Sequence, residues 1–213
     1  MKKNKFTAAA ALALIAIAIF LLWRQFSTPR VNLRPSSAVG EVLADELGRM
    51  LGTTGRVVLI GRGSSRDGGD ASSQQIASLQ TALKRRALTQ STVTEWLPRP
   101  PAGTMDLGGV SPEQFLELID KNKDANSFVV FAGLPPLSQD LAAKIAARSL
   151  KLLAVCGYNA NVRHWLEGRA LLVAVVPRPD DLPAGTSPPQ SPIDWFRREF
   201  QMLTPENVGQ LGY

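Results

Sequence analysis

The feature that most constrains the fold is an alternation, between residues 56 and 176, of short apolar runs with segments of helical spacing. The runs are rich in β-branched residues and end at loops, which is typical of strands buried on both faces of a parallel sheet. Because strands alternate with helices, the sequence predicts an α/β domain: a five-stranded, mostly parallel sheet with helices on both faces. The predicted strands occupy residues 56–60, 92–97, 127–132, 151–156 and 170–176.

The predicted helices carry recognisable start signals. Apolar residues at helical spacing predict a first helix over 38–51, before the first strand. Ser111, Pro112 and Gln114 form a capping-box pattern with proline at the first helical position. Ser138 is expected to cap the helix that precedes the fourth strand. These signals support the same alternating order of elements.

An apolar run over 6–23, preceded by a basic stretch at 1–5, predicts one transmembrane helix. At a rise of 1.5 Å per residue it would span roughly 27 Å, close to the thickness of a bilayer core. A cleaved signal peptide is the alternative, but no small-residue cleavage site follows the run. The basic N-terminus favours a cytoplasmic start, with the main domain on the periplasmic side of the cell membrane. Residues 24–37 are interpreted as a tether, followed by the α/β domain at 38–176.

The last part of the chain changes composition twice. Residues 177–192 are rich in proline and are predicted to be a stiff linker, and residues 193–213 form an aromatic C-terminal tail. Trp195, Phe196 and Phe200 in this tail have two interpretations. They fold back onto the sheet as core, or they dock on another subunit, since Trp and Phe are enriched at interfaces.

Composition excludes several functional classes. The formal net charge is +6, but lysines in the first five residues supply three of these charges, so nucleic-acid binding is not expected. The chain has one cysteine, Cys156, and one histidine, His164, so neither an intrachain disulfide nor a multi-Cys/His metal site can form. Cys156 ends an apolar strand as a core residue would. No catalytic set and no cofactor motif is recognised, which favours a non-enzymatic protein.

The glycine-rich loop 61–70 follows the first strand, where open α/β sheets bind ligands. Arg62, Gly63, Ser64 and Arg66 are candidates to hold a small anionic or polar ligand. The dinucleotide and phosphate-loop motifs are absent, and a flexible polar loop is the alternative. Tyr158 and Asn159, which follow the fourth strand, are further ligand candidates; turn formation is their alternative role.

The order of elements resembles one lobe of a type I periplasmic binding protein, or a flavodoxin-like domain. The residues that carry the resemblance are Arg56 to Gly61 and Ser127-Phe-Val-Val-Phe-Ala-Gly-Leu-Pro135. The resemblance implies a ligand site at the strand ends. A complete binding protein has two lobes with a cleft between them, whereas this chain has room for one.

Two functions are therefore expected from the sequence. The first is a membrane-anchored accessory or scaffold subunit whose partners are the membrane and other membrane-protein subunits. The alternative is an extracytoplasmic module that binds or senses a small ligand. The anchor and the aromatic tail favour the first, and the loops at the strand ends favour the second.

Overall fold

The computed structural model describes residues 17–18, 32–52, 55–63, 71–86, 91–98, 109–157, 160–178 and 189–210. It divides into two compact units, Met1–Asn32 and Leu33–Tyr213. In the first unit only Ile17, Ala18 and Asn32 are described, and the first two are helical. The predicted membrane segment 6–23 thus lies almost wholly outside the described residues. Within the described ranges, no helix combines the length and hydropathy needed to cross a bilayer.

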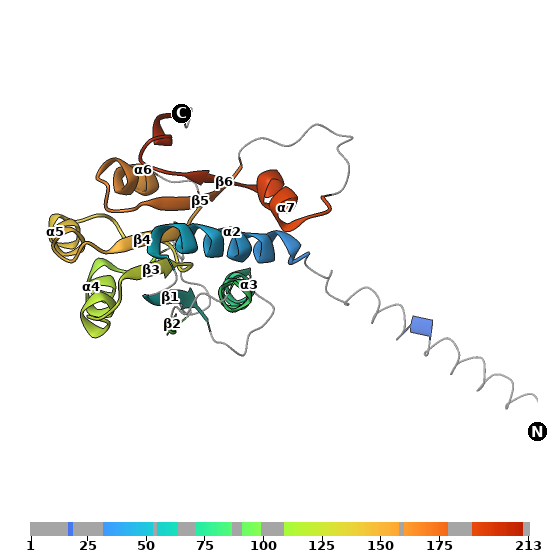
Figure 1. Cartoon of the computed structure of the whole chain (residues 1–213), viewed down its shortest axis with the longest axis horizontal. Helices are drawn as coiled ribbons and strands as arrows, with labels where there is room; N and C mark the ends of the chain where they lie inside the picture. Colours follow the sequence, from blue (N-terminus) through green and yellow to red (C-terminus); the bar gives the residue numbers. More distant parts are fainter. Residues whose placement is uncertain are drawn as a thin grey trace, which may run out of the picture. The chain divides into compact units, whose positions relative to one another are not determined.

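The second unit is built around a six-stranded sheet with the order β2-β1-β3-β4-β5-β6. The first five strands are parallel, and β6 pairs antiparallel with β5 at one edge. Figure 1 shows these strands lying side by side. Their bounds are β1 (Arg56–Arg62), β2 (Ser91–Leu97), β3 (Ser127–Val130), β4 (Lys151–Val155), β5 (Val173–Pro177) and β6 (Phe200–Leu203).

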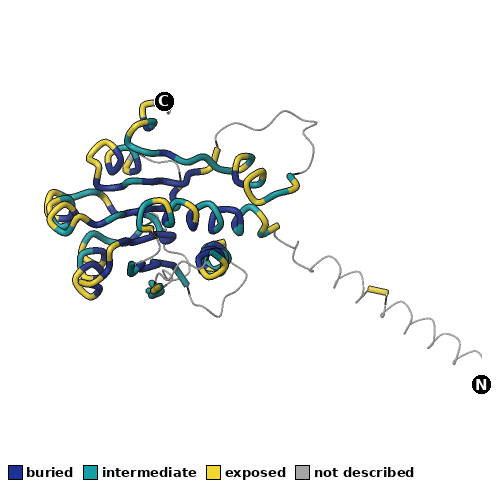
Figure 2. The backbone as a smooth tube through the Cα atoms, viewed as in Figure 1, coloured by how far each residue is buried: buried dark blue, intermediate teal, exposed yellow. Residues whose placement is uncertain are grey.

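Helices cover both faces of the sheet, and alternate residues of each strand face opposite cores. Val58 and Ile60 of β1 belong to the core under α4, α5 and α6, whereas Val57 and Leu59 belong to the core under α2, α3 and α7. This burial on both faces explains the continuous apolar runs of the sequence; Figure 2 shows the strands as the buried centre. The helices are α2 (Arg34–Leu51), α3 (Ala71–Arg85), α4 (Pro112–Lys121), α5 (Gln139–Ala147), α6 (Ala160–Glu167) and α7 (Pro192–Glu199), followed by the short 3-10 helix η1 (Val208–Gln210).

The predicted five-stranded sheet is wrong by one strand. The missing strand, β6, comes from the segment predicted to be a separate tail, and α7 of that segment packs beside α2 on the sheet. The sequence analysis missed this continuation because it assigned the prolines of 177–192 to a linker. In the structure, Pro177 is the last residue of β5 and Pro192 is the first residue of α7. Proline suits both positions. At the start of α7, the backbone N–H that proline lacks would have no partner within the helix.

The predicted start signals are confirmed. Ser111 accepts a hydrogen bond from the Gln114 backbone N–H at 3.2 Å, and both halves of the capping box are present. Ser138 caps α5 by accepting from Leu141 N at 3.2 Å. A second capping box, not predicted, opens α7: Ser191 Oγ accepts from Asp194 N at 3.2 Å and donates to Asp194 Oδ2 at 2.6 Å. The hydrogen bond from the Ser191 side chain lowers the pKa of Asp194.

Candidate functional site

The parallel strands finish together at one edge of the sheet, called here the carboxyl edge. Its described residues include Arg62 at the end of β1, Gly63 after β1, Pro98 after β2, Phe131–Ser138 after β3, and Cys156 and Gly157 after β4. Loops at this edge are the usual ligand-binding positions of open α/β sheets. The carboxyl edge is therefore the first place to look for a site.

Arg62 ties two loops of the carboxyl edge together. Its Nη2 donates to Gly109 O at 2.6 Å, and it lies 3.5 Å from Ala132 O. A guanidinium can serve several acceptors in a fixed planar arrangement. These contacts give Arg62 a structural role at the carboxyl edge. Direct contact between Arg62 and a ligand, which the sequence predicts, stays a prediction.

Glycines allow the same loops to approach closely. Gly109 has a φ of 137°, and a Cβ there would lie 2.7 Å from Leu134 O. Val110 N donates to Gly133 O at 3.3 Å, and Gly63 N donates to Leu97 O at 2.9 Å. The loops that follow β1, β2 and β3 are therefore held to one another by backbone contacts, which pre-organises this part of the edge.

The remaining predicted ligand residues, Ser64, Arg66, Tyr158 and Asn159, lie outside the described residues. Cys156 is buried, and burial raises the pKa of its thiol to about 12. A thiol in that condition stays protonated at neutral pH and is a poor nucleophile. His164 is exposed on α6. The core role predicted for Cys156 agrees with this burial.

The three aromatic residues of the predicted interface have different surroundings. Phe196 is 5% exposed and belongs to the core between α2, α7 and the sheet. Phe200 stacks on it, with ring centroids 6.0 Å apart. Trp195 is half-buried. Trp195 and Phe200 both pack against this core. Folding back onto the sheet therefore describes all three residues, and an interface role for any of them stays a prediction.

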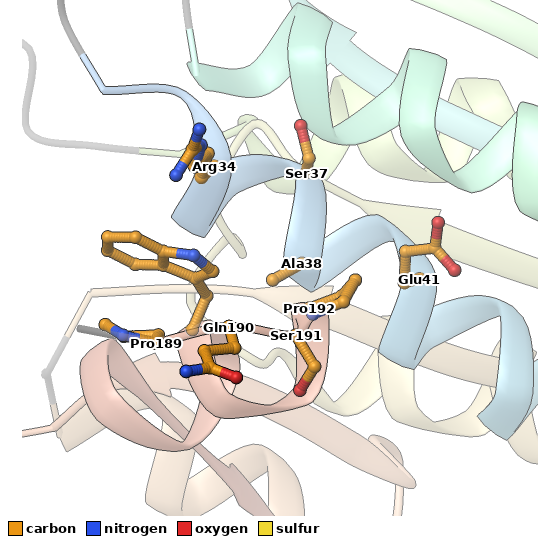
Figure 3. Close-up of a pocket in the computed structure, with 9 residues that line it drawn as sticks. Arg34, Ser37, Ala38, Glu41, Pro189, Gln190, Ser191 and Pro192 are labelled. Carbon is orange, nitrogen blue, oxygen red and sulfur yellow. The ribbon is translucent and has the colours of Figure 1, made fainter. Parts of the chain in front are cut away.

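A hollow of about 330 Å³, missed by the sequence analysis, lies between the start of α2 and the start of α7. It is called here the α2–α7 hollow. Arg34, Ser37, Ala38 and Glu41 form the α2 wall, opposite Pro189 to Pro192 (Figure 3), and Trp195 also lines it. The hollow joins elements about 150 residues apart in the chain, so it could not be found without the fold. Its volume is at the lower end of pockets that hold small ligands.

Comparison with solved structures shows similarity at the level of fold. AraP, an arabinose-binding protein from Geobacillus stearothermophilus, is 11% identical with a TM-score of 0.56, over 84% of this chain and 63% of that one. The sugar-binding protein of a Bacillus halodurans ABC transporter is 9% identical with a TM-score of 0.54, over 83% and 64%. The fold resembles one lobe of a type I periplasmic binding protein.

The resemblance predicted from the sequence is thus confirmed for the fold. A putative LacI transcriptional regulator from Bacteroides fragilis is similar too, with 10% identity and a TM-score of 0.51, over 83% of this chain and 62% of that one. The chain spans less than two thirds of each of these periplasmic-binding-protein-like structures. A scan against family models and a search of curated proteins both find no match. Because one fold serves transport receptors and a regulator, the fold leaves the function open.

Proposed function

We propose that the domain is a module that binds a small polyhydroxylated ligand at its carboxyl edge. The observation that carries the proposal is the set of loops after β1, β2 and β3, which Arg62 and close glycine contacts hold together at the end of a parallel sheet. The similar structures with TM-scores above 0.5 include proteins that bind arabinose or other sugars. In this proposal, segment 6–23 anchors the module, with the domain on the periplasmic side of the cell membrane.

The matched pair Arg62→Gln and Arg56→Gln tests this proposal. We expect arabinose, ribose, galactose or glucose to bind the full chain in nanodiscs with a Kd of about 1 mM or tighter, and Arg62→Gln to weaken that binding about tenfold. Glutamine cannot hold the carbonyls of both loops, so the edge loses its arrangement. Arg56 lies at the other end of β1, paired with Asp124, and Arg56→Gln should leave affinity unchanged. Isothermal titration calorimetry measures both; failure of all four sugars to bind contradicts the proposal.

A second candidate function is the accessory or scaffold subunit. Ile193 of α7 favours it, because this side chain is 42% exposed and is the one exposed large hydrophobic side chain in the described part of Leu33–Tyr213. We expect Ile193→Asp to release any partner chain that copurifies with the protein after gentle detergent extraction, without lowering the melting temperature. Ala143→Asp, at an exposed position of α5 on the other face of the sheet, is the control. A chain that purifies alone in both forms contradicts the scaffold function.

A further inference from the structure

Strand β2 lies at one end of the described sheet order, with β1 beside it in parallel register along its whole length. Ser91 N, at the start of β2, donates to Gly55 O at 3.0 Å, and Leu97 O, at its end, accepts from Gly63 N at 2.9 Å. The backbone groups of successive residues point to opposite sides of a strand. The odd-numbered residues of β2 therefore bond to β1.

The even-numbered residues of β2 point their backbone groups away from the sheet. These residues are Thr92, Thr94 and Trp96, and each carries one N–H and one C=O on the outer side. Within the described ranges, no hydrogen bond reaches any of these outward backbone groups. A row of unpaired groups along a strand is a template on which another strand can pair.

The opposite side of the sheet, formed by β6, is partly covered. Cys156 N donates to Val175 O, so Val175 bonds toward β4 and its partner Met202 points its backbone groups away from β5. Met202 O accepts there from Asn207 Nδ2 at 3.2 Å, and Asn207 Oδ1 accepts from Thr204 N at 2.7 Å. The turn after β6 thus occupies part of its outer side, whereas β2 has no such contact among the described residues.

The composition of β2 also suits pairing with another strand. Residues 91–97 contain no proline, lysine or arginine, the residues that often protect a sheet edge. Their one charge is Glu95, which pairs with Lys121 at 2.8 Å and accepts from Asn122 Nδ2 at 3.5 Å. Because α4 supplies this compensation, Glu95 does not leave the strand with an unbalanced negative charge.

We propose that the β2 strands of two copies of this chain pair antiparallel about a two-fold axis at Thr94, which joins the two sheets into one. In this register Thr94 faces the partner's Thr94, and Thr92 faces the partner's Trp96. All the outward N–H and C=O groups of both strands then find a partner. A threonine opposite a tryptophan is also a favourable cross-strand pair.

Charge and pairing select this register over its neighbours. An axis at Glu95 would place two carboxylates directly opposite one another, which is destabilising. An axis at Val93 would leave the outward groups of Trp96 without a strand residue opposite. With the axis at Thr94, Glu95 faces the partner's Val93. The strand therefore complements itself, which is why the occupant is a second copy.

The helices leave room for this pairing. Three strand spacings of about 4.8 Å would separate the two β1 strands, a distance of about 14 Å. Helix α3 packs over β1, where a Cβ on Gly61 would lie 2.7 Å from Ile76 Cδ1. Packed helices need about 10 Å between their axes, so the two α3 helices fit side by side. The interface lies beside the sheet rather than at the carboxyl edge, so the proposal does not depend on the sugar site.

Thr94→Pro and Thr94→Val form the matched test. Proline removes the outward N–H without touching a bond to β1, as proline at a sheet edge does. Valine keeps the N–H and the branched shape, and loses the contact of the hydroxyl with Gln80. We expect the full chain in detergent to dimerise between about 1 and 100 μM, Thr94→Val to match it, and Thr94→Pro to need at least about tenfold higher concentration. Sedimentation velocity measures the dimer, and circular dichroism checks the fold.

Cysteine cross-linking tests the register, even if Thr94→Pro fails to fold. Under mild oxidation Thr94→Cys should form a disulfide-linked dimer, because directly opposite residues lie about 5.5 Å apart between Cα atoms. Thr92→Cys should not, because its two copies would be about 14 Å apart along the strands. The unmodified chain, whose Cys156 is buried, should give no cross-linked dimer.

Three results would overturn the proposal. One is an unmodified chain that stays monomeric up to about 100 μM. Another is a folded Thr94→Pro variant that dimerises as readily as the unmodified chain, which would place the contact elsewhere. The third is a Thr92→Cys variant that cross-links as readily as Thr94→Cys.

Discussion

Gly40→Ala is expected to lower the free energy of unfolding by about 3 kcal/mol, although alanine normally stabilises a helix interior by about 1 kcal/mol over glycine. The reason is the contact between α2 and α3. A Cβ at position 40 would lie 2.5 Å from Gln75 O and 2.6 Å from Leu79 N. Both atoms belong to the backbone of α3, so relief requires the two helices to move apart and to lose packing around Val39 and Leu43, which are fully buried.

Urea denaturation of the full chain, followed by circular dichroism, measures this loss. Gly209→Ala is the matched control, because a Cβ at position 209 meets nothing within 4 Å; we expect it to change stability by less than about 0.5 kcal/mol. If Gly40→Ala proves neutral or stabilising, the described approach of α2 and α3 is wrong.

Trp165→Ala is expected to cost about 4 kcal/mol, in the range of other buried Trp→Ala changes. Trp165 is fully buried on α6. Its ring packs edge-on against Phe115, with centroids 6.2 Å apart, and its Nε1 donates to Pro135 O at 2.8 Å. The side chain therefore fills the core under α4, α5 and α6 and also holds the loop after β3.

Trp165→Phe separates these two contributions. A phenyl ring replaces the larger indole, so Pro135 O loses its donor and a small cavity is left, and we expect a loss of about 2 kcal/mol. The same urea denaturation applies, with Trp195→Phe as the control at a half-buried tryptophan, where less than about 1 kcal/mol is expected. A Trp165→Phe variant as stable as the unmodified chain would contradict a stabilising role for both the hydrogen bond to Pro135 and the full indole volume.

The parallel part of the fold could be predicted because local signals agree with one another. The strand β1 was predicted over 56–60 and is found at Arg56–Arg62, since a continuous β-branched run fits a strand buried on both faces. The helix start at Ser111 was visible because a capping box is a short-range pattern. Such features need no knowledge of distant residues.

The last strand could not be predicted in the same way. The run Phe200–Leu203 is short and half-buried, and it becomes a strand only because β5 offers an unpaired edge. Tertiary context of this kind overrides local propensity. The same limit applies to the candidate sites. Arg62 could be named from the loop that follows β1, but its hydrogen bond to Gly109 O depends on a segment far away in the chain. The α2–α7 hollow likewise depends on two segments that are far apart in the sequence.

The position of α2 between α3 and α7 (Figure 1) has a consequence for biosynthesis. A ribosome releases α2 before any strand of the sheet, whereas α7 and β6 emerge only after all five parallel strands. A nascent chain that stalls before Pro192 would hold α2 with one side uncovered and β5 as an open edge, which is a template for aggregation. Synthesis of α7 and β6 is therefore the step that covers this side of the domain, and chains that stop before Pro192 should be substrates for quality-control proteases.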